Sequence, residues 1–362
     1  MNRNYYLDIL RAFAVILVLG RHIDIFPTQS DLVLTIVEFW HRGGWVGVDL
    51  FFVLSGFLIS GLLFKEYNVW GRIQIGRFLL RRALKIYPPF WALMVFIICL
   101  RVIRHQSLEW DKIGAELLFF QNYWPGIWRQ TWTLAVEEHF YLLSAVGIFW
   151  MTRMYRDRPF RFLPGVLAFV AAACLYLRIS NANQHAFEYM THTFPTHLRM
   201  DSLGIGVYLA YLCQYKLRVV ERIARHKIFL VGVGTALLSL PFIADLESSP
   251  FIYTWGYTLA YIGSACLVLV AANSKNSTRT GVKAIAYIGS HSYSIYLWHM
   301  VVEIGASNYF NQLPKNFFWW MAYLTAYICG SLTLGIFCSK CVEMPVIRFR
   351  ERMFPSRSRF MP

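Results

Sequence analysis

Apolar stretches of about 20 residues recur along the whole chain and are separated by short polar connections. Stretches of this length are typical of membrane-spanning helices, because about 20 residues at 1.5 Å each cross the hydrocarbon core. The pattern predicts an all-α, polytopic integral membrane bundle. Residues 1–362 would form a single membrane domain with no appended soluble domain. About ten transmembrane helices are expected, near residues 6–26, 44–64, 88–104, 132–152, 162–178, 200–215, 228–244, 252–273, 291–310 and 317–339.

Composition agrees with a membrane protein rather than a soluble enzyme. Hydrophobic residues make up 57% of the chain and charged residues 15%, whereas a soluble domain carries about 25% charged residues. The mean hydropathy is +0.43. The seven cysteines include a Cys-x-x-Cys pair at Cys338 and Cys341, but no second pair or nearby histidine completes a metal site. No metal ion is therefore expected.

The net charge of +15 is explained by orientation rather than by a nucleic-acid partner. With the N-terminus in the cytoplasm, 25 of the 35 Lys and Arg residues fall in inner connections and eight in outer ones. The other two, Arg11 and Arg21, lie inside the first segment. This asymmetry follows the positive-inside rule. It predicts a multi-pass protein of the bacterial cytoplasmic (inner) membrane, with both termini cytoplasmic.

Ionisable residues inside the first apolar segment are candidates for function, because charged groups in hydrocarbon are costly. On a helix, His22 lies within roughly 20° of Arg11, and Asp8 lies about 60° away. The three residues can share one face, with His22 about 16 Å beyond Arg11. Two interpretations stay open. Arg11 and His22 form part of a functional stripe, or Arg11 reaches the inner headgroups while His22 makes a structural hydrogen bond between helices.

Depth along the segments places further ionisable residues near His22. Asp49 in the second segment and Glu137 in the fourth are expected in the same outer third of the membrane, with Arg199 and Asp201 at an outer entrance. A histidine with a carboxylate partner can act as a general base near neutral pH. A structural polar network and a proton-coupled exporter of a sugar or small metabolite are the alternatives. Inverted repeats would strengthen the exporter hypothesis, and the sequence shows none.

A basic segment at residues 77–88 lies on the predicted cytoplasmic side. Read as a helix, it is amphipathic and clusters Arg81, Arg82 and Lys85 against apolar residues. Two interpretations are equally open for it. It is an interfacial helix on anionic lipid, or a clamp in which basic side chains bind phosphate groups.

Seven sequence blocks in order resemble the membrane acyltransferase family 3, which includes bacterial O-antigen, exopolysaccharide and nodulation-factor O-acyltransferases. The resemblance covers essentially the whole chain. Three substitutions depart from the family pattern: Ala12 for Gly, Thr133 for Ser and Lys85 for Arg. The blocks are Leu7–Ala12 with ten residues between Arg11 and His22, Gly47–Ile59, Arg81–Pro88, Trp132–Tyr141, Arg199–Asp201, Ser292–His299 and Glu343–Pro345.

The resemblance implies transfer of an acyl group, usually acetyl, from cytoplasmic acyl-CoA to a hydroxyl of a sugar presented across the membrane. We expect His22 to deprotonate the acceptor hydroxyl and Glu137 to orient His22, with Asp49 as a further catalytic carboxylate. A relay through an acylated His22 stays open. The residues expected to bind donor or acceptor are Asp8, Arg11, Arg81, Arg82, Lys85, Thr133, Tyr141, Arg199, Asp201 and His299.

The same resemblance defines the expected partners. Acyl-CoA, acetyl-CoA in the first place, is the donor, and no cofactor is expected to be bound permanently. The acceptor would be a sugar, a polysaccharide or a lipid-linked glycan. The protein itself would be in contact with membrane lipid, and no nucleic acid is expected as a partner. Many relatives carry a C-terminal esterase-like domain that is not expected in this chain.

Overall fold

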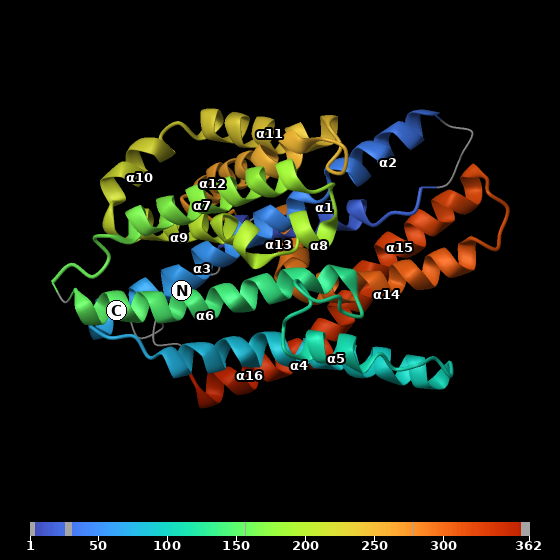
Figure 1. The fold of residues 1–362 in the computed structure, drawn as a ribbon, viewed down its shortest axis with the longest axis horizontal. Helices are drawn as coiled ribbons and strands as arrows, with labels where there is room; N and C mark the ends of the chain where they lie inside the picture. The colour runs from blue at the N-terminus through green and yellow to red at the C-terminus, as the bar shows by residue number, and fades with distance from the viewer. Residues whose placement is uncertain (1–3, 26–30, 156, 278, 356–362) are drawn as a thin grey trace.

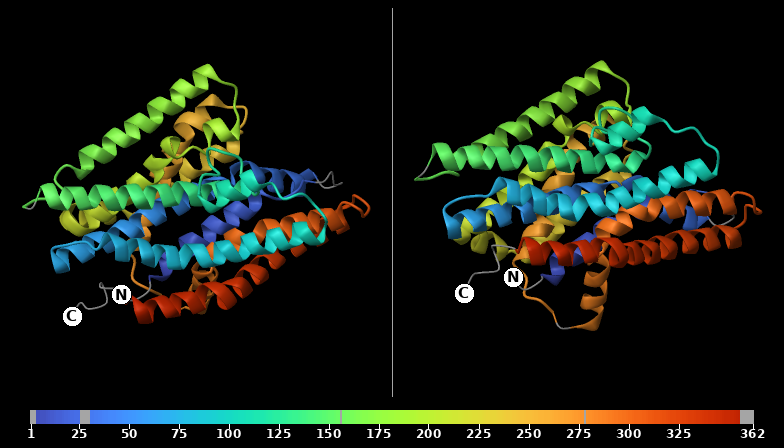
Figure 2. Two further views of the ribbon diagram at one scale, coloured as in Figure 1. Left: turned by 60° about the horizontal axis from the view of Figure 1, so that its bottom comes forward. Right: turned by 90° about the horizontal axis from the view of Figure 1, so that it is seen from below.

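The computed structural model describes residues 4–25, 31–155, 157–277 and 279–355. Within these ranges the chain forms helices and no β-strand. The long helices run along the long axis of the molecule (Figures 1 and 2). The α-helices are α1 Tyr5–Arg21, α2 Asp31–Gly43, α3 Val46–Trp70, α4 Ile75–Ile103, α5 Trp110–Leu117, α6 Trp132–Met154, α7 Leu163–Gln184, α8 Tyr189–His192, α9 Met200–Tyr215, α10 Leu217–Ala224, α11 Lys227–Ile243, α12 Tyr257–Ala272, α13 Thr280–Ser290, α14 Ser292–Phe310, α15 Phe317–Cys338 and α16 Met344–Met353.

Four short helices of other types complete the description. Two are 3₁₀-helices and two are π-helical turns, which continue directly into or out of a longer α-helix. π-turns inside α-helices are often found at functional sites. The four are η1 Arg129–Thr131, η2 Thr196–Leu198, η3 Ile252–Gly256 and η4 Ser339–Glu343.

Two ends of the bundle can be distinguished. The start of α1 and the end of α16 lie toward one end, here called the terminal end, and the turn between α14 and α15 lies at the other, the distal end (Figures 1 and 2). The chain therefore begins and finishes its described part on the same side of the bundle. This agrees with an even number of crossings, although which side of a membrane each end faces stays a prediction.

The expected helical membrane character is confirmed. Each of the ten predicted apolar segments overlaps a helix, although the first was expected to continue past Arg21, where α1 ends. Six helical stretches of the described residues are long and apolar enough to cross a membrane. A seventh is added if α10 and α11, bent by 82° at their junction, form one span. Helices α1 and α9 contain only 17 and 16 residues, shorter than the usual span of about 20. The count of ten spans stays a prediction.

Helix α7 illustrates the surface that faces lipid. Only 17% of its apolar window is buried within the protein, and Phe169 and Tyr176 are 74% and 70% exposed. Exposing these large aromatic side chains to water would be unfavourable, whereas contact with hydrocarbon is favourable for them. The backbone polar groups of such a helix are satisfied within the helix itself, as a bilayer requires.

Helices α3 and α9 approach each other closely through glycines. A Cβ atom on Gly56 would lie 2.1 Å from the carbonyl oxygen of Leu203, and one on Gly206 would lie 2.3 Å from that of Val53. Small residues of this kind allow membrane helices to pack backbone to backbone. The contact holds the start of α3, with Asp49, against the start of α9.

The connection expected between the second and third apolar segments is mostly helical, which corrects the predicted boundaries. Helix α3 continues to Trp70, and α4 begins at Ile75 instead of near residue 88. Pro88 and Pro89 lie inside α4 rather than at its start. The basic segment is thus the first part of α4, fixed to the bundle on the same rigid helix as the apolar span.

Candidate functional site

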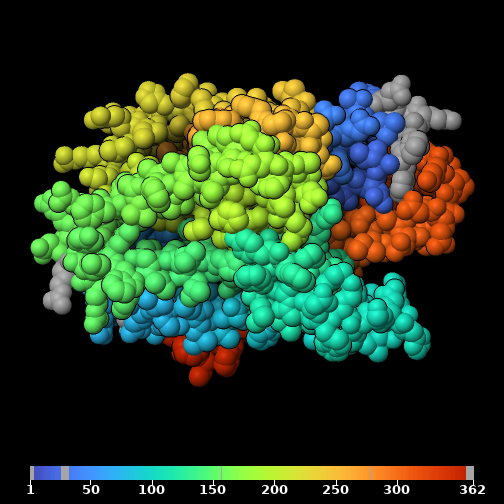
Figure 3. Space-filling model, in the orientation of Figure 1, coloured from blue at the N-terminus to red at the C-terminus, as the bar shows by residue number. Residues whose placement is uncertain are grey.

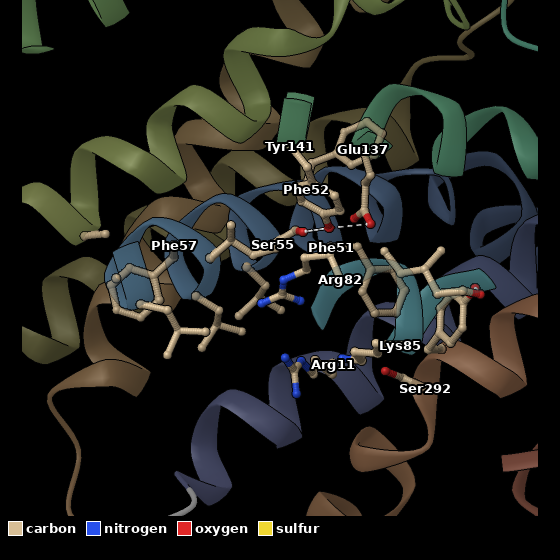
Figure 4. Close-up of a pocket in the computed structure, with 18 of the residues that line it drawn as sticks. Arg11, Phe51, Phe52, Ser55, Phe57, Arg82, Lys85, Glu137, Tyr141 and Ser292 are labelled. Carbon is tan, nitrogen blue, oxygen red and sulfur yellow. Dashed lines mark hydrogen bonds between the residues drawn. The ribbon is translucent and has the colours of Figure 1, made fainter. Parts of the chain in front are cut away.

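A cavity of about 550 Å³ lies toward the terminal end, between α1, α3, α4, α6, α9 and α14. We call it the terminal cavity. Its wall is apolar along α3 and basic where α1 and α4 face it (Figure 4). Its polar lining consists of Arg11, Ser55, Lys65, Arg82, Lys85, Thr133, Glu137, Tyr141, Cys213, Gln214, Ser290, Ser292, Tyr293, Tyr296 and Glu343.

A hydrogen-bonded chain of three side chains crosses one wall of the terminal cavity (Figure 4). The Tyr141 hydroxyl donates to Glu137 Oε2 at 2.7 Å, one helical turn away. The Ser55 hydroxyl lies 2.5 Å from the same Tyr141 oxygen. Because Tyr141 donates its hydroxyl proton to Glu137, the Ser55 hydroxyl is the donor and the Tyr141 oxygen the acceptor of this second hydrogen bond. The chain fixes Glu137 in the wall, facing the cations of α4.

Four cationic side chains line the terminal cavity: Lys65 of α3 and a group of three from α1 and α4. Arg11 of α1 and Arg82 and Lys85 of α4 point toward one another in Figure 4. Arg11 also forms an ion pair with Asp8 at 3.0 Å, so Asp8 supports Arg11 without lining the cavity. Arg82 lies with its guanidinium carbon 5.8 Å from the ring centre of Tyr141. The group has the donors that a phosphate would need.

Arg81 does not belong to this group, contrary to the sequence prediction. Its guanidinium binds Glu351 of α16 at 2.8 Å and also donates to the carbonyl oxygen of Phe354. Neighbouring residues on a helix point about 100° apart, so Arg82 can face the cavity only if Arg81 faces elsewhere. Arg81 joins α4 to α16.

A second cavity, of about 690 Å³, lies toward the distal end. We call it the distal cavity. Its ionisable lining contains Arg21, His22, His41, Arg101, Arg104, Arg129, Arg199 and Glu247, and its aromatic lining contains Trp45, Trp128, Trp132, Tyr189, Phe194, Tyr257 and Tyr296. In Figure 3 the segment from the end of α4 to α5 projects at this end and is separated by a hollow from the α14–α15 pair.

His22 lies in the distal cavity against a second histidine. The rings of His22 and His299 are 5.1 Å apart. His299 is fully buried and its Nδ1 donates to the carbonyl oxygen of Tyr296, which leaves Nε2 as the lone-pair nitrogen. That Nε2 has no hydrogen-bond partner in the described part of the protein. The structure thus brings two predicted site residues, His22 and His299, into contact.

Glu137 and Asp49 do not accompany His22, which corrects the predicted constellation. Glu137 lines the terminal cavity and His22 the distal cavity. The sequence argument compared the depths of the residues along their helices, but the rotation of α6 about its axis turns Glu137 toward Tyr141 and α4. No carboxylate within the described ranges forms an ion pair with His22.

Asp49 is instead the partner of a buried arginine. Both of its carboxylate oxygens accept hydrogen bonds from Arg199 Nη2 at 2.9 Å, and one accepts from Ser202 Oγ at 2.9 Å. Arg199 is 1% exposed and its guanidinium carbon lies 3.8 Å from the ring centre of Tyr257. Asp49 and Arg199 therefore join α3 to α9 as a structural pair, with Arg199 forming part of the distal cavity wall.

Asp201 is also structural and does not stand at an entrance. Its carboxylate accepts from Arg178 of α7 at 2.6 Å, and both side chains are fully buried. Arg178 further donates to the carbonyl oxygen of Leu198 at 2.8 Å and to Thr258 Oγ1 at 2.9 Å. The predicted binding residue thus anchors the start of α9 to α7.

Tyr296 and Val48 line both cavities. The Tyr296 hydroxyl donates to the carbonyl oxygen of Gln130 at 2.7 Å and lies 2.7 Å from Thr133 Oγ1, which is its donor. Thr133 was predicted as a binding residue, and here it holds this tyrosine. The two cavities thus share the Tyr296 side chain as part of their walls, and we interpret it as a partition between them.

Several lining residues had no individual signal in the sequence. Ser55, Gln130 and Tyr296 are polar residues within or beside motifs, and only their contacts reveal what they do. Glu343 could have been noted as a carboxylate at the end of an apolar segment. It lines the terminal cavity at the π-turn η4 and accepts from Ser294 at 2.7 Å and Ser339 at 2.9 Å.

Glu116 of α5 fastens the loop that leads into α6. It is fully buried, and its Oε1 accepts from the Trp128 backbone N–H at 3.1 Å and from Thr131 Oγ1 at 2.8 Å. This loop supplies Trp128, Arg129 and Gln130 to the distal cavity. Burial raises the pKa of Glu116 to about 7. The carboxyl is therefore more easily protonated in the folded protein than in the unfolded chain.

We expect this carboxyl to make stability depend on pH. Its contribution is fully present below the unfolded pKa of about 4.3 and is lost as pH rises through about 7. The loss amounts to about 2 kcal/mol between about pH 5 and pH 8. Thermal unfolding of Glu116→Gln, which cannot titrate, should show that much less decline than the wild type over this range. Equal slopes for the two proteins would contradict the assignment.

Within the described residues no group of three or more His, Cys, Asp and Glu side chains could hold a metal ion. Cys338 lies at the end of α15 and Cys341 in η4, both as free thiols.

Comparison with known proteins identifies what the chain is similar to. The sequence model of the family described as "Acyltransferase domain" matches residues 4–339. The chain is 24% identical over 330 residues to O-acetyltransferase OatA of Staphylococcus aureus strain NCTC 8325, with 84% of this chain and 51% of that protein covered. It is 27% identical over 334 residues to SACOL0978, a provisionally named O-acetyltransferase of S. aureus strain COL, with 85% and 52% covered. The chain thus spans about half the length of these relatives. No solved structure matches it.

Proposed function

Because this chain belongs to the acyltransferase domain family, we propose that it is an integral membrane O-acyltransferase. It transfers an acyl group, acetyl in the first place, from cytoplasmic acyl-CoA to a hydroxyl of a sugar or glycan on the outer side of the membrane. The proposal places the protein in the bacterial inner membrane with its terminal end in the cytoplasm.

The observation that carries the proposal is the pair of cavities that meet at Tyr296. Arg11, Arg82 and Lys85 in the terminal cavity suit the phosphates of acyl-CoA, which guanidinium and ammonium groups bind through charge-assisted hydrogen bonds. His22 in the distal cavity suits a hydroxyl acceptor. An extended pantetheine arm would reach over the roughly 16 Å of helix between Arg11 and His22.

In the proposed reaction His22 accepts the proton of the acceptor hydroxyl. The resulting oxygen nucleophile attacks the thioester carbonyl carbon, the carbon–sulfur bond breaks, and the CoA thiolate leaves and takes up a proton. His299 packs against His22 and positions its ring. Glu137, held by Tyr141, belongs to the donor side and balances the charge of Arg82 and Lys85.

Donor binding can be tested on the two α4 cations. We expect Arg82→Gln and Lys85→Gln each to raise the Kd for acetyl-CoA about tenfold or more, because each removes a charged hydrogen-bond donor. S-acetylpantetheine, which lacks the nucleotide phosphates, should bind the variants and the wild type equally well. Binding of both compounds to purified protein in lipid discs measures this.

The control removes a cation at the same end of the bundle. Arg72 is exposed and outside the lining of the terminal cavity, so Arg72→Gln should bind acetyl-CoA like the wild type. If all three variants weaken binding equally, the phosphates are attracted by the general charge of this end. If none does, the donor site lies elsewhere.

The partition can be tested on Tyr296. Tyr296→Ala should join the two cavities and admit water to the thioester, since closed sites suppress hydrolysis by excluding water. We expect acetyl-CoA hydrolysis without acceptor to rise several-fold while acyl transfer falls. Tyr296→Phe keeps the ring and should hydrolyse little. Free CoA thiol, titrated with and without acceptor, reports both reactions. Hydrolysis at the wild-type rate in Tyr296→Ala would contradict the partition.

A further inference from the structure

The distal cavity carries more positive charge than its carboxylates balance. Among the described residues five arginines line it, together with a single carboxylate, Glu247. Three of these arginines have a carboxylate partner. The ion pairs and their N–O distances are Arg21–Glu247 at 3.1 Å, Arg101–Glu109 at 2.9 Å and Arg199–Asp49 at 2.9 Å.

The other two arginines are not neutralised by the described part of the chain. No carboxylate in the described ranges lies within 4.0 Å of the nitrogens of Arg104 or Arg129. Arg129 lies with its guanidinium carbon 5.3 Å from the ring centre of Tyr189, a contact that orients the group without using its N–H donors. Arg104, the residue directly after α4, is exposed and lines the same cavity. Two guanidinium groups are therefore available to a ligand.

Arg129 is exposed, and hydrogen bonds fix the chain on both sides of it. Trp128 precedes it and lines the same cavity, and the Trp128 backbone is fixed by buried Glu116 at 3.1 Å. The next residue, Gln130, is held at its carbonyl by Tyr296. A cavity with aromatic walls and a few polar groups is typical of binding sites for small polar molecules. Guanidinium groups there favour carboxylate or phosphate, whose oxygens match their paired donors.

We propose that the acceptor is anionic, with a carboxylate or phosphate group that binds Arg104 and Arg129 and thereby presents a nearby hydroxyl to His22. This inference rests on the proposed function, because it names the acceptor class of the same reaction. The anionic group belongs to an acidic sugar of the glycan or to the phosphate that joins a glycan to a lipid carrier. Both sources present the same kind of oxygen atoms.

The charge of the product tests the proposal directly. Purified protein in lipid discs is incubated with radiolabelled acetyl-CoA and with total glycans and lipid-linked glycans from the source organism lacking this gene. The labelled product should bind an anion exchanger. Mild acid, which cleaves glycans from lipid-linked phosphates, then separates the two sources. Label that stays bound indicates an acidic sugar, and label that is released indicates the carrier phosphate.

Variants of Arg104 and Arg129 test whether these two side chains recognise the charge of the acceptor. Arg104→Gln and Arg129→Gln should each lower kcat/KM for the labelled acceptor about tenfold, and the double variant about a hundredfold. Arg129→Lys keeps the charge but lacks the paired donors, so it should recover only part of the loss. Lys315→Gln removes an exposed cation at the same end but outside the cavity and should behave like the wild type. Acetyl-CoA should bind the double variant with unchanged Kd, which shows that it is folded.

Two results would overturn the anionic acceptor: a labelled product that passes the exchanger uncharged, or a double variant that acylates an anionic acceptor with wild-type efficiency. Failure of the proposed function looks different. In that case wild-type protein transfers label to no glycan of either charge.

Discussion

His22→Ala should lower the rate of acyl transfer by about 10²- to 10⁴-fold, the usual contribution of a general base. The variant should still bind acetyl-CoA with wild-type affinity, because His22 lines the distal cavity, whereas the basic side chains proposed to bind the donor line the terminal cavity. Transfer of radiolabel from acetyl-CoA to acceptor measures the first effect, and equilibrium binding of the donor measures the second.

A second histidine serves as the control. His105 is exposed beyond the end of α4 and outside the lining of the distal cavity, so His105→Ala should transfer at the wild-type rate. Near-normal transfer by His22→Ala would show that another group accepts the proton. Covalent acyl-protein formed by the wild type without acceptor would replace direct attack by a relay through an acylated enzyme.

Breaking the pair between Asp49 and Arg199 should cost about 3–5 kcal/mol of stability, because it leaves a buried charge without its partner. Asp49→Ala is expected to unfold at a much lower temperature than the wild type. The double variant Asp49→Leu with Arg199→Met removes both charges and should recover most of the loss. Thermal unfolding in detergent, followed by fluorescence-detected gel filtration, compares the three proteins.

An exposed ion pair provides the contrast. Glu109 accepts from Arg101 at 2.9 Å and is about one-third exposed, so Glu109→Gln should lower the unfolding temperature far less than Asp49→Ala does. A double variant as unstable as Asp49→Ala would show that the hydrogen bonds of Arg199, rather than its charge balance, hold α3 and α9 together.

The sequence predicted the helical membrane character well, because apolar length is a property of each segment alone. It also grouped Arg82 and Lys85 on one basic helix face, since helix periodicity suffices for that, but it included Arg81, which binds Glu351 instead. The family resemblance is confirmed by the family match over residues 4–339. The sidedness of the termini, the donor, the acceptor and the roles of the site residues stay predictions.

The pairing of charges could not be predicted, because it depends on how each helix is rotated about its axis. Asp49 and Glu137 were both assigned to His22 by depth, yet one faces Arg199 and the other Tyr141. Arg81 and Arg82 differ by a single position and face different neighbours. The meeting point of the cavities at Tyr296 depends on side chains from several helices, and no single segment contains that information.

The partition at Tyr296 also bears on the bioenergetics of a cell that carries this protein. The two cavities would join into one longer aqueous path if that ring moved aside. Each elementary charge that leaked along it would dissipate about 2.3 kcal/mol per 100 mV of membrane potential. A protein that carries out the transfer proposed above therefore also has to remain an electrical insulator. In this chain the Tyr296 ring and the Val48 side chain line both cavities, so these two side chains would have to block such a leak.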